Sequence, residues 1–298
     1  MKLTVNDVSL HPALGRVVLE KHRNDAAATL MAVICAAAAD AYLADLSLAV
    51  GDVVRLYGDD GAERFVGSIH CIDRTPEQIV ITAFDKGIYL ARNELWGVFA
   101  GNGEEICRAV AEKLQIGVER IDADETYRTV IAMTGQNAFS ILRAAAGEGR
   151  EIVVEGERLV VRKRRDTVFS LPKEQILDVS STADIREMVN RSAVVDYKGN
   201  LLSLVHRADD ILRYGMFQCV QERQGLDTRG QAAAALRGLR RNAEVLVQGN
   251  LGYCCGAGVR GEQSEWGLDG LYCISAVSHR WENGLFTTEL TLEGEDEV

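Results

Sequence analysis

Two adjacent thiols and a later imidazole come closest in this sequence to a nucleophile and its base. Cys254 and Cys255 lie in a glycine-rich stretch, and His279 follows in a segment of alternating apolar residues. A thiol nucleophile needs a lowered pKa and a base that a third group orients. The neighbouring residues contain no such pattern, so we interpret the thiols as buried or loop residues and His279 as a surface histidine near a strand end. We expect no catalytic residue.

A short glycine-rich segment, Gly101 to Ile106, is a candidate phosphate-binding loop. It lacks the third glycine of that motif, and Glu104 and Glu105 would repel a phosphate at a helix N-terminus. Asn102, followed three residues later by Glu105, instead predicts a capping box at the start of a helix. The acidic run Asp122 to Glu125 is interpreted as a solvated turn and not as a catalytic carboxylate pair.

Metal binding is not expected either. The seven cysteines are scattered, and none has the paired spacing of a structural zinc site. Free thiols indicate a reducing compartment. We expect neither a metal ion nor a cofactor. The cysteines are Cys35, Cys71, Cys107, Cys219, Cys254, Cys255 and Cys273.

The charge balance argues against nucleic acid as a specific partner. The formal net charge of the 298 residues is −11, whereas phosphate binding needs a clustered basic face. The basic run Arg158 to Arg165 is interrupted by strand formers, and we interpret it as the solvated side of a β-hairpin. The most apolar stretch, Ala26 to Ala39, is shorter than the ~20 residues that span a bilayer, so no membrane partner is expected.

Alternating strands dominate both ends of the chain. Segments before residue 91 alternate apolar and polar residues between short turns, which predicts a meander that closes into a sandwich or barrel. Near the C-terminus, Gly270 to Trp281 and Leu285 to Leu292 flank Asn283-Gly284, a strong signal for a type I′ hairpin turn. Residues 26–45 leave helix and strand open, because alanine favours a helix while its neighbours favour a strand.

Between these ends the apolar period changes from 2 to 3.6. One helix is predicted after Asn102, with Gly117 in the left-handed position at its end. A second helix is predicted from Thr134 to Ala146, with Gly147 as its stop. A hairpin then turns at Gly156, with strands at Glu151 to Glu155 and Arg158 to Arg162.

These elements predict an α+β, mainly β fold with a β-rich region on each side of a small insert. We assign residues 1–91 to the first β-rich domain, 92–170 to a small α+β insert domain and 171–298 to the second β-rich domain. The second β-rich domain includes a helical segment at 205–243. Within it, the Ala-rich stretch Thr228 to Arg241 is the strongest helix by propensity.

Three aromatic residues of the last segment are candidates for a subunit interface: Trp266, Trp281 and Phe286. Aromatic side chains on β surfaces are commonly buried in cores or in contacts between subunits. For Trp266, Trp281 and Trp96 the alternative is a stacking platform for sugars, and an exposed tryptophan-lined face would be its distinguishing feature.

The order of several segments resembles the baseplate hub proteins of contractile phage tails and phage-tail-like bacteriocins. The resemblance is colinear and covers about residues 50–298. One departure is Gly256-Ala257, where the family has Gly-Asp before its penultimate strands. The segments are Gly51 to Tyr57, Phe65 to Ile69, Ile81 to Leu90, Asp184 to Arg191, Tyr214-Gly215 and Gly267 to Gly284.

This resemblance implies a structural protein and not an enzyme. It implies that residues 1–91 and 171–298 are two similar small β-barrel domains. It also implies a homotrimer, so that three chains form a ring of six barrels beneath a hexameric tail tube. The implied partners are the tail tube protein, the central spike protein, the tape-measure protein and the baseplate wedge proteins. Such a hub is assembled in the bacterial cytoplasm and becomes part of the virion or tail-like particle.

Alternatives remain at this level. The chain could be the hub of a related secretion spike, a cell-wall hydrolase or a carbohydrate-binding module. The sequence leaves open whether the particle is a phage or a bacteriocin, whether DNA passes through the ring, and what Cys254-Cys255 do.

Overall fold

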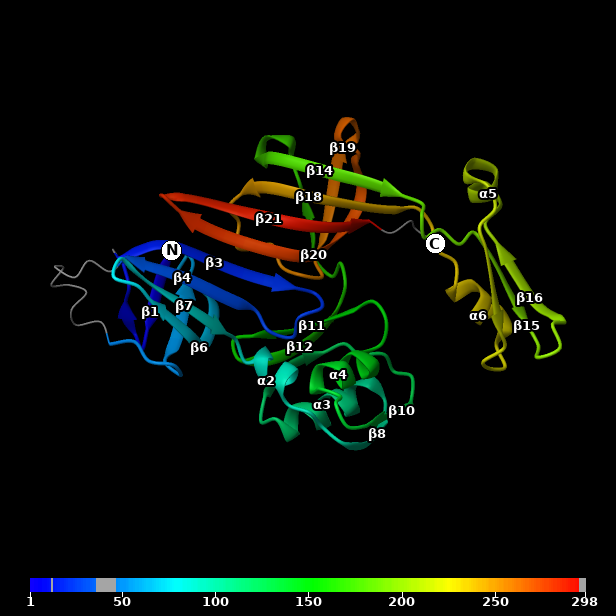
Figure 1. Ribbon diagram of the computed structural model, residues 1–298, viewed down its shortest axis with the longest axis horizontal. Coiled ribbons are helices and arrows are strands. Elements are labelled where there is room, and N and C mark those ends of the chain that lie inside the picture. The colour runs from blue at the N-terminus through cyan, green and yellow to red at the C-terminus, as the bar shows by residue number, and fades with distance from the viewer. Residues whose placement is uncertain (12, 36–46, 295–298) are drawn as a thin grey trace.

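Strands dominate the chain, as the computed structural model shows (Figure 1). The structure describes residues 1–11, 13–35 and 47–294. Several short helices accompany the strands. No helix in these ranges is long and apolar enough to cross a membrane. The predicted α+β, mainly β fold is confirmed.

The first β half curls around one hydrophobic cluster that contains Leu3, Leu30, Ile69 and Ile81. Its strands follow the order β3-β4-β7-β6-β5-β1-β2 in the sheet. Within residues 26–45, which the sequence left open, a strand forms first, and positions 36–45 lie outside the described residues. The strands are β1 (Lys2–Val5), β2 (Val8–Ser9), β3 (Leu14–His22), β4 (Thr29–Cys35), β5 (Val53–Tyr57), β6 (Glu63–Arg74) and β7 (Gln78–Phe84).

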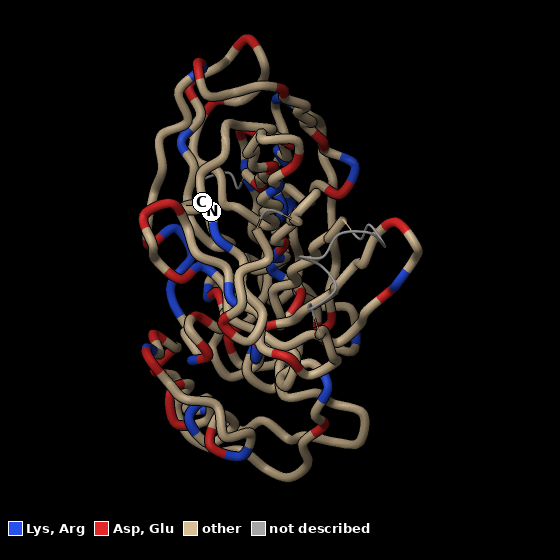
Figure 2. Tube along the Cα trace, turned by 90° about the vertical axis from the view of Figure 1, so that its left-hand side faces the viewer, with Lys and Arg blue, Asp and Glu red and all other residues tan. Residues whose placement is uncertain are grey.

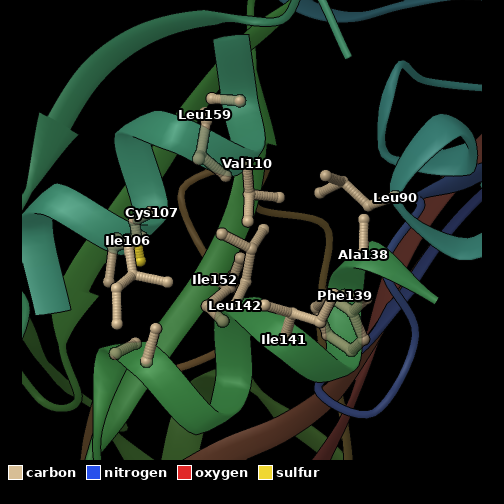
Figure 3. Packing of buried hydrophobic residues seen from close by; sticks show 14 of the residues in the cluster. Leu90, Ile106, Cys107, Val110, Ala138, Phe139, Ile141, Leu142, Ile152 and Leu159 are labelled. Carbon is tan, nitrogen blue, oxygen red and sulfur yellow. The ribbon is translucent and has the colours of Figure 1, made fainter. Parts of the chain in front are cut away.

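An α+β insert follows, with its own core between two helices and a small sheet (Figure 3). Ile106 and Val110 of one helix meet Ile141 and Leu142 of the next, all of them buried. The elements are α2 (Gly87–Arg92), β8 (Gly97–Gly101), α3 (Gly103–Lys113), β9 (Gly117–Ile121), β10 (Arg128–Ala132), α4 (Ala138–Ala146), β11 (Arg150–Glu155) and β12 (Arg158–Lys163).

The helix boundaries in the insert agree only in part with those predicted from the sequence. The capping box of α3 is confirmed, because the Asn102 side chain accepts from the Glu105 amide while the Glu105 carboxylate accepts from the Asn102 amide. The left-handed residue after α3 is Gln115 and not Gly117, which starts β9. Helix α4 starts at Ala138 and not at Thr134, because Asn137 caps it.

The second β half surrounds another cluster, which contains Val245, Ile274 and Leu290. Its hairpin turn is confirmed, since Asn283 and Gly284 have φ of 53° and 77°. The elements are β13 (Val168–Ser170), η1 (Lys173–Gln175), β14 (Ile176–Asp184), β18 (Arg240–Gln248), β19 (Gly258–Gln263), η2 (Ser264–Trp266), β20 (Leu268–Glu282) and β21 (Leu285–Gly294).

A small subdomain, residues 185–239, lies between β14 and β18 at the far end from the first half (Figure 1). The helical segment expected at 205–243 is here two short helices separated by a strand. The Ala-rich helix ends at Ala234 and not at Arg241, because the chain must return to the sheet, where β18 begins at Arg240. The elements are β15 (Arg191–Val195), β16 (Leu201–His206), α5 (Ala208–Tyr214), β17 (Gln218–Glu222) and α6 (Thr228–Ala234).

The two β halves repeat one another strand by strand. The order β3-β4-β7-β6-β5 in the first half corresponds to β14-β18-β21-β20-β19 in the second, and every neighbouring pair is antiparallel. Matching register shifts lie between Leu14 and Arg16 and between Ile176 and Asp178. A second pair of shifts lies in the equivalent strands β6 and β20.

The backbone hydrogen bonds just before β5 and just before β19 are also equivalent. Gly51 N donates to Ile69 O at 2.8 Å, and Gly256 N donates to Ile274 O at 2.9 Å. Both glycines have positive φ, 97° and 83°. The departure at Gly256-Ala257 therefore leaves the backbone arrangement unchanged from that of Gly51-Asp52.

One sheet runs through both halves, because β3 pairs with β20. The pairs run antiparallel from Ala276↔His22 to Glu282↔Arg16. We call this pairing the internal joint. The domain limits at residues 91 and 170 stay a prediction.

Candidate functional site

The residues that the sequence singled out for chemistry line one cavity. Its volume is about 360 Å³, and it lies where β3, β6, the β11–β12 hairpin and the segment before β19 meet. Cys254, Cys255 and His279 line it together with Lys21 and Asp85. The structure therefore brings the thiols and the imidazole to one place, although they are separated in sequence.

His279 is buried, so the expectation of a surface histidine is wrong. Only 4% of the residue is exposed, because β20 is paired with β21 on one side and with β3 on the other. His279 Nδ1 lies 3.0 Å from Thr288 Oγ1. Burial lowers the pKa of His279 to about 4. The imidazole is therefore neutral at neutral pH.

The thiols of the cavity are protonated at neutral pH. Burial raises the pKa of Cys255 to about 12 and also raises the pKa of Cys254. Cys255 is buried and Cys254 is partly buried, as expected from the sequence. Cys255 Sγ donates to Lys21 O at 3.1 Å. A thiolate nucleophile needs the opposite shift, so the arrangement does not activate either thiol.

A buried ionic cluster joins the insert to both halves of the sheet. Glu151 of β11 is 1% exposed, and its carboxylate lies 3.6 Å from Arg23 Nε and 3.8 Å from Arg164 Nε. Arg23 also contacts Glu293 of β21 at 2.5 Å. Burial raises the pKa of Glu151. Within the described part of the chain, neither carboxylate oxygen of Glu151 has a hydrogen-bond partner.

The basic run Arg158 to Arg165 is only in part a solvated hairpin side. Arg158 and Lys163 are exposed. Arg162, however, reaches into the junction, where its guanidinium contacts Glu155 at 2.8 Å and Cys254 Sγ at 3.3 Å. The run was interpreted from its own hairpin alone, and the segment that covers it lies about ninety residues later in the chain.

Asp85 connects the first half to the insert through backbone hydrogen bonds. Its carboxylate accepts from Ala28 N at 3.0 Å and from Gly87 N at 2.8 Å. Burial raises the pKa of Asp85 to about 6, against the opposing effect of the Lys21 ammonium. Burial also lowers the pKa of Lys21. The two charges therefore stabilise one another at the base of the cavity.

The three proposed interface aromatics lie in two places. Trp281 and Phe286 stack at the hairpin end, with ring centroids 4.2 Å apart and an interplanar angle of 7°. Trp281 also packs against the cluster of the first half. Trp266 lies in η2, with Lys173 Nζ 4.8 Å from its ring centroid. All three are partly buried within the chain, and their role in an interface stays a prediction.

The sequence reading missed an apolar surface on the subdomain 185–239. Leu212 and Leu226 are 88% and 98% exposed. In a subdomain of three short strands and two short helices, such side chains find few partners. The signal was present as leucines outside any amphipathic period. The other exposed apolar residues are Tyr197, Leu201, Leu202, Leu204, Met216, Phe217 and Val220.

The face of the sheet turned away from the cores is acidic. Paired residues share a face, and one row runs Glu20–Ser278–Glu289–Leu246–Asp178 across five strands. The three carboxylates in this row are exposed. Over the whole chain, acidic and basic residues are interspersed (Figure 2). No group of three or more metal-ligating side chains occurs in the described ranges.

Comparison with solved structures shows similarity along nearly the whole chain. The 43 kDa tail protein of prophage MuSo2 from Shewanella oneidensis superposes with a TM-score of 0.71 at 13% identity, covering 98% of this chain and 95% of that one. The tail protein from Neisseria meningitidis gives 0.70 at 13% identity with the same coverage. Because the sequence identities are low, these two matches establish the fold of the chain and nothing further.

A secretion component has the same fold. The E. coli c3393 protein, described as a component of the type VI secretion system with structural similarity to the T4 bacteriophage tail proteins gp27 and gp5, gives a TM-score of 0.62 at 8% identity. The match covers 100% of this chain and 77% of that one. No curated protein matches in sequence. A family model described as YQBQ-like matches residues 17–293. The chain therefore belongs to the YQBQ-like family and has the fold of phage tail proteins.

Proposed function

We propose that this chain is the structural baseplate hub of a contractile injection particle, either a phage tail or a tailocin, and joins the tail tube to the central spike. The observation that carries the proposal is the repeat of the two β halves in strand order, register and bulges. A chain with two equivalent units can present six similar surfaces from three copies. Such a trimer matches a six-fold tube above and a three-fold spike below.

The proposed partners follow from that position. The ring would contact the tail tube protein on one side and the spike on the other, with the wedge proteins around it and the tape-measure protein at its centre. The acidic row across the sheet, with Glu20, Asp178 and Glu289, supports a channel-facing role. A carboxylate surface repels a polyanion and lets it pass without tight binding. Assembly in the bacterial cytoplasm and export as part of the particle belong to the same proposal.

The proposal assigns no catalysis to the chain. The best candidates for a nucleophile and base are two protonated thiols and a neutral buried imidazole. Purified protein is expected to leave cell-wall substrate intact on a zymogram. Hydrolysis that Cys255→Ala or His279→Ala abolishes would favour the hydrolase alternative.

Imaging of the assembled particle tests the hub directly. We expect cryo-electron microscopy of particles from the native host to place three copies on the tube axis, between the last tube ring and the spike. A matched particle preparation from a strain lacking the coding sequence should contain no such layer. Six copies in the ring, or a position away from the axis, would contradict the proposal.

A second candidate is the hub of a related secretion spike. The match to the E. coli type VI component covers all of this chain and 77% of that one, which favours it. The two candidates differ in what is attached to the ring. Co-purification with a contractile tail sheath and a tape-measure protein would support a phage or tailocin, whereas a fused or bound spike without a tape-measure protein would support the secretion system.

A further inference from the structure

Among the described residues, β14 and the second part of β6 each have an edge without a strand partner. Strand β14 pairs with β18 on one side only. Residues 71–74 of β6 pair with β7 on one side, whereas the earlier part of β6 also pairs with β5. An unpaired edge carries a row of backbone donors and acceptors that can take up another strand. The two edges are therefore candidates for contacts between chains.

The repeat relates both edges to the internal joint. Strand β6 corresponds to β20, and β14 corresponds to β3, by strand order and by the positions of the bulges. In the internal joint, β20 and β3 pair with each other over seven residues. The equivalent strands, β14 and β6, are far apart in the same sheet: β14 is its first strand, and β6 lies near the other end, beside β5. One chain cannot pair them, but two chains can.

The side chains of β3 and β14 differ in solvent exposure, as expected if only β3 has a strand partner on both sides. Val17, Val18 and Leu19 of β3 are no more than 8% exposed, because strands flank them on both sides. The equivalent positions on β14, Val179, Ser180 and Ser181, are partly or fully exposed. Polar residues keep an unpaired edge from aggregating before its partner arrives.

We propose that β6 of one copy pairs antiparallel with β14 of the next copy, as β20 pairs with β3 within each chain. This external joint rests on the proposed ring. We aligned β6 with β20 and β14 with β3 at their bulges and applied the register of the internal joint, which gives four residue pairs between the two copies. They are Cys71↔Asp184, Ile72↔Ala183, Asp73↔Thr182 and Arg74↔Ser181. The contact is head-to-tail, so repeating it builds a closed ring if the rotation closes.

In this register, core-side residues of β6 lie opposite core-side residues of β14. Ile72 pairs with the buried Ile81 on the core side of the first half. Ala183 lies two residues from Ser181, which pairs with the buried Ala243, so it is on the core side of the second half. A slip of one residue would instead place Ile72 opposite Thr182 or Asp184, which lie on the open face. The external joint therefore has one preferred register.

A disulfide between copies tests this register, because the native Cys71 already occupies one position. In Asp184→Cys, the two thiols would be directly opposite, at a Cα separation of about 4.5–5.5 Å that a disulfide can span. Thr182→Cys is the matched control, because it lies diagonally from Cys71 at about 7–8 Å. Under mild oxidation of concentrated protein, we expect on the order of tenfold more covalent oligomer in Asp184→Cys, since spans beyond about 7 Å do not bridge.

Two further variants complete the test. Adding Cys71→Ser to Asp184→Cys should remove the covalent oligomer. In the Cys71→Ser background, Asp73→Cys with Thr182→Cys should restore it. Circular dichroism and mass photometry on the reduced samples report folding and the number of copies. Equal bridging by Thr182→Cys and Asp184→Cys would overturn the register.

The outcomes separate this inference from the hub itself. A ring that assembles without selective Asp184→Cys bridging overturns the external joint and leaves the hub standing. A chain that stays monomeric at high concentration and is absent from particles overturns both. Selective bridging into dimers and trimers supports the joint.

Discussion

The two β halves share strand order and register, but their large core side chains lie on different strands. In the first half Leu30 pairs with Ala83, and in the second the equivalent pair is Ala243 with Leu292. All four side chains are buried. The large residue has moved from one strand to its neighbour while the volume of the pair is conserved. A barrel of this kind therefore constrains the register and the total core volume more strongly than the residue at any one position.

The halves also differ where they meet the rest of the chain. At the end of β7 the first half has Asp85, which bonds the backbone at Ala28 and Gly87. The equivalent position, by the register of the strand pairs, is Gly294, the last residue of β21. Of these two equivalent positions, only the one in the first half carries a buried carboxylate. The shared fold therefore does not require a carboxylate at this position, and Asp85 serves the contact between the first half and the insert.

The largest effect is expected from removing the large residue of each equivalent pair. Leu30→Ala and Leu292→Ala should each lower the free energy of unfolding by about 2–5 kcal/mol, because each leaves a cavity in a packed core. Adding Ala83→Leu to Leu30→Ala should recover part of that loss, since it recreates the arrangement of the second half. Chemical denaturation measures all three. No recovery in the double variant would show that the halves do not pack equivalently.

A pH-dependent effect is expected from Asp85. Its folded pKa of about 6 lies above the ordinary value of 3.8, so between these values only the folded state binds the proton. Stability from this group therefore falls as pH rises from about 4 to about 6, by about 3 kcal/mol at 1.36 kcal/mol per pKa unit. Asp85→Asn should lose that dependence.

His279 contributes with the opposite sign. Its pKa is lowered to about 4, so its stabilisation is lost as pH falls from about 6.5 to about 4. The contributions of Asp85 and His279 therefore oppose one another between about pH 4 and pH 6, so acid should destabilise Asp85→Asn more than it destabilises the native chain. Thermal unfolding at a series of pH values measures both. Parallel profiles for the two proteins would contradict the assignment.

A smaller effect separates the two equivalent glycines. A Cβ at Gly256 would lie 2.8 Å from Glu151 Cβ, whereas a Cβ at Gly51 would have no neighbour within 4 Å. Both positions have positive φ, so an alanine at either costs about 1 kcal/mol or more. Gly256→Ala should therefore destabilise more than Gly51→Ala. Equal shifts in the denaturation midpoint would place the insert away from the second half.

The smallest effect is expected at the hairpin turn. Gly284 has φ of 77°, and a Cβ there would meet nothing within 4 Å. Gly284→Val should cost about 1 kcal/mol or more, from backbone strain alone. Gly284→Asn is the matched control, because asparagine tolerates the left-handed region. Differential scanning calorimetry compares the two, and an unchanged midpoint in the valine variant would contradict the turn conformation.

Sequence reasoning worked best where the cause lies within a few residues. The capping box at Asn102 and the turn at Asn283-Gly284 were predicted and formed. The end of the Ala-rich helix was predicted too late, because helix propensity does not register the pairing that starts β18 at Arg240. The repeat of the halves came only from the resemblance, since equivalent positions such as Leu30 and Ala243 differ in residue type.

By itself the sequence determined the mainly β composition, the local caps and turns, and the absence of an activated nucleophile pattern, because each depends on neighbours along the chain. The tertiary structure alone decided that β20 pairs with β3, which brings Ser278 against Glu20, 258 positions apart. That pairing buries His279, and packing of the insert against it encloses Glu151 with its arginines. The physical reason is that burial and charge pairing depend on which edges meet, and many edges in this chain have similar patterns of alternation.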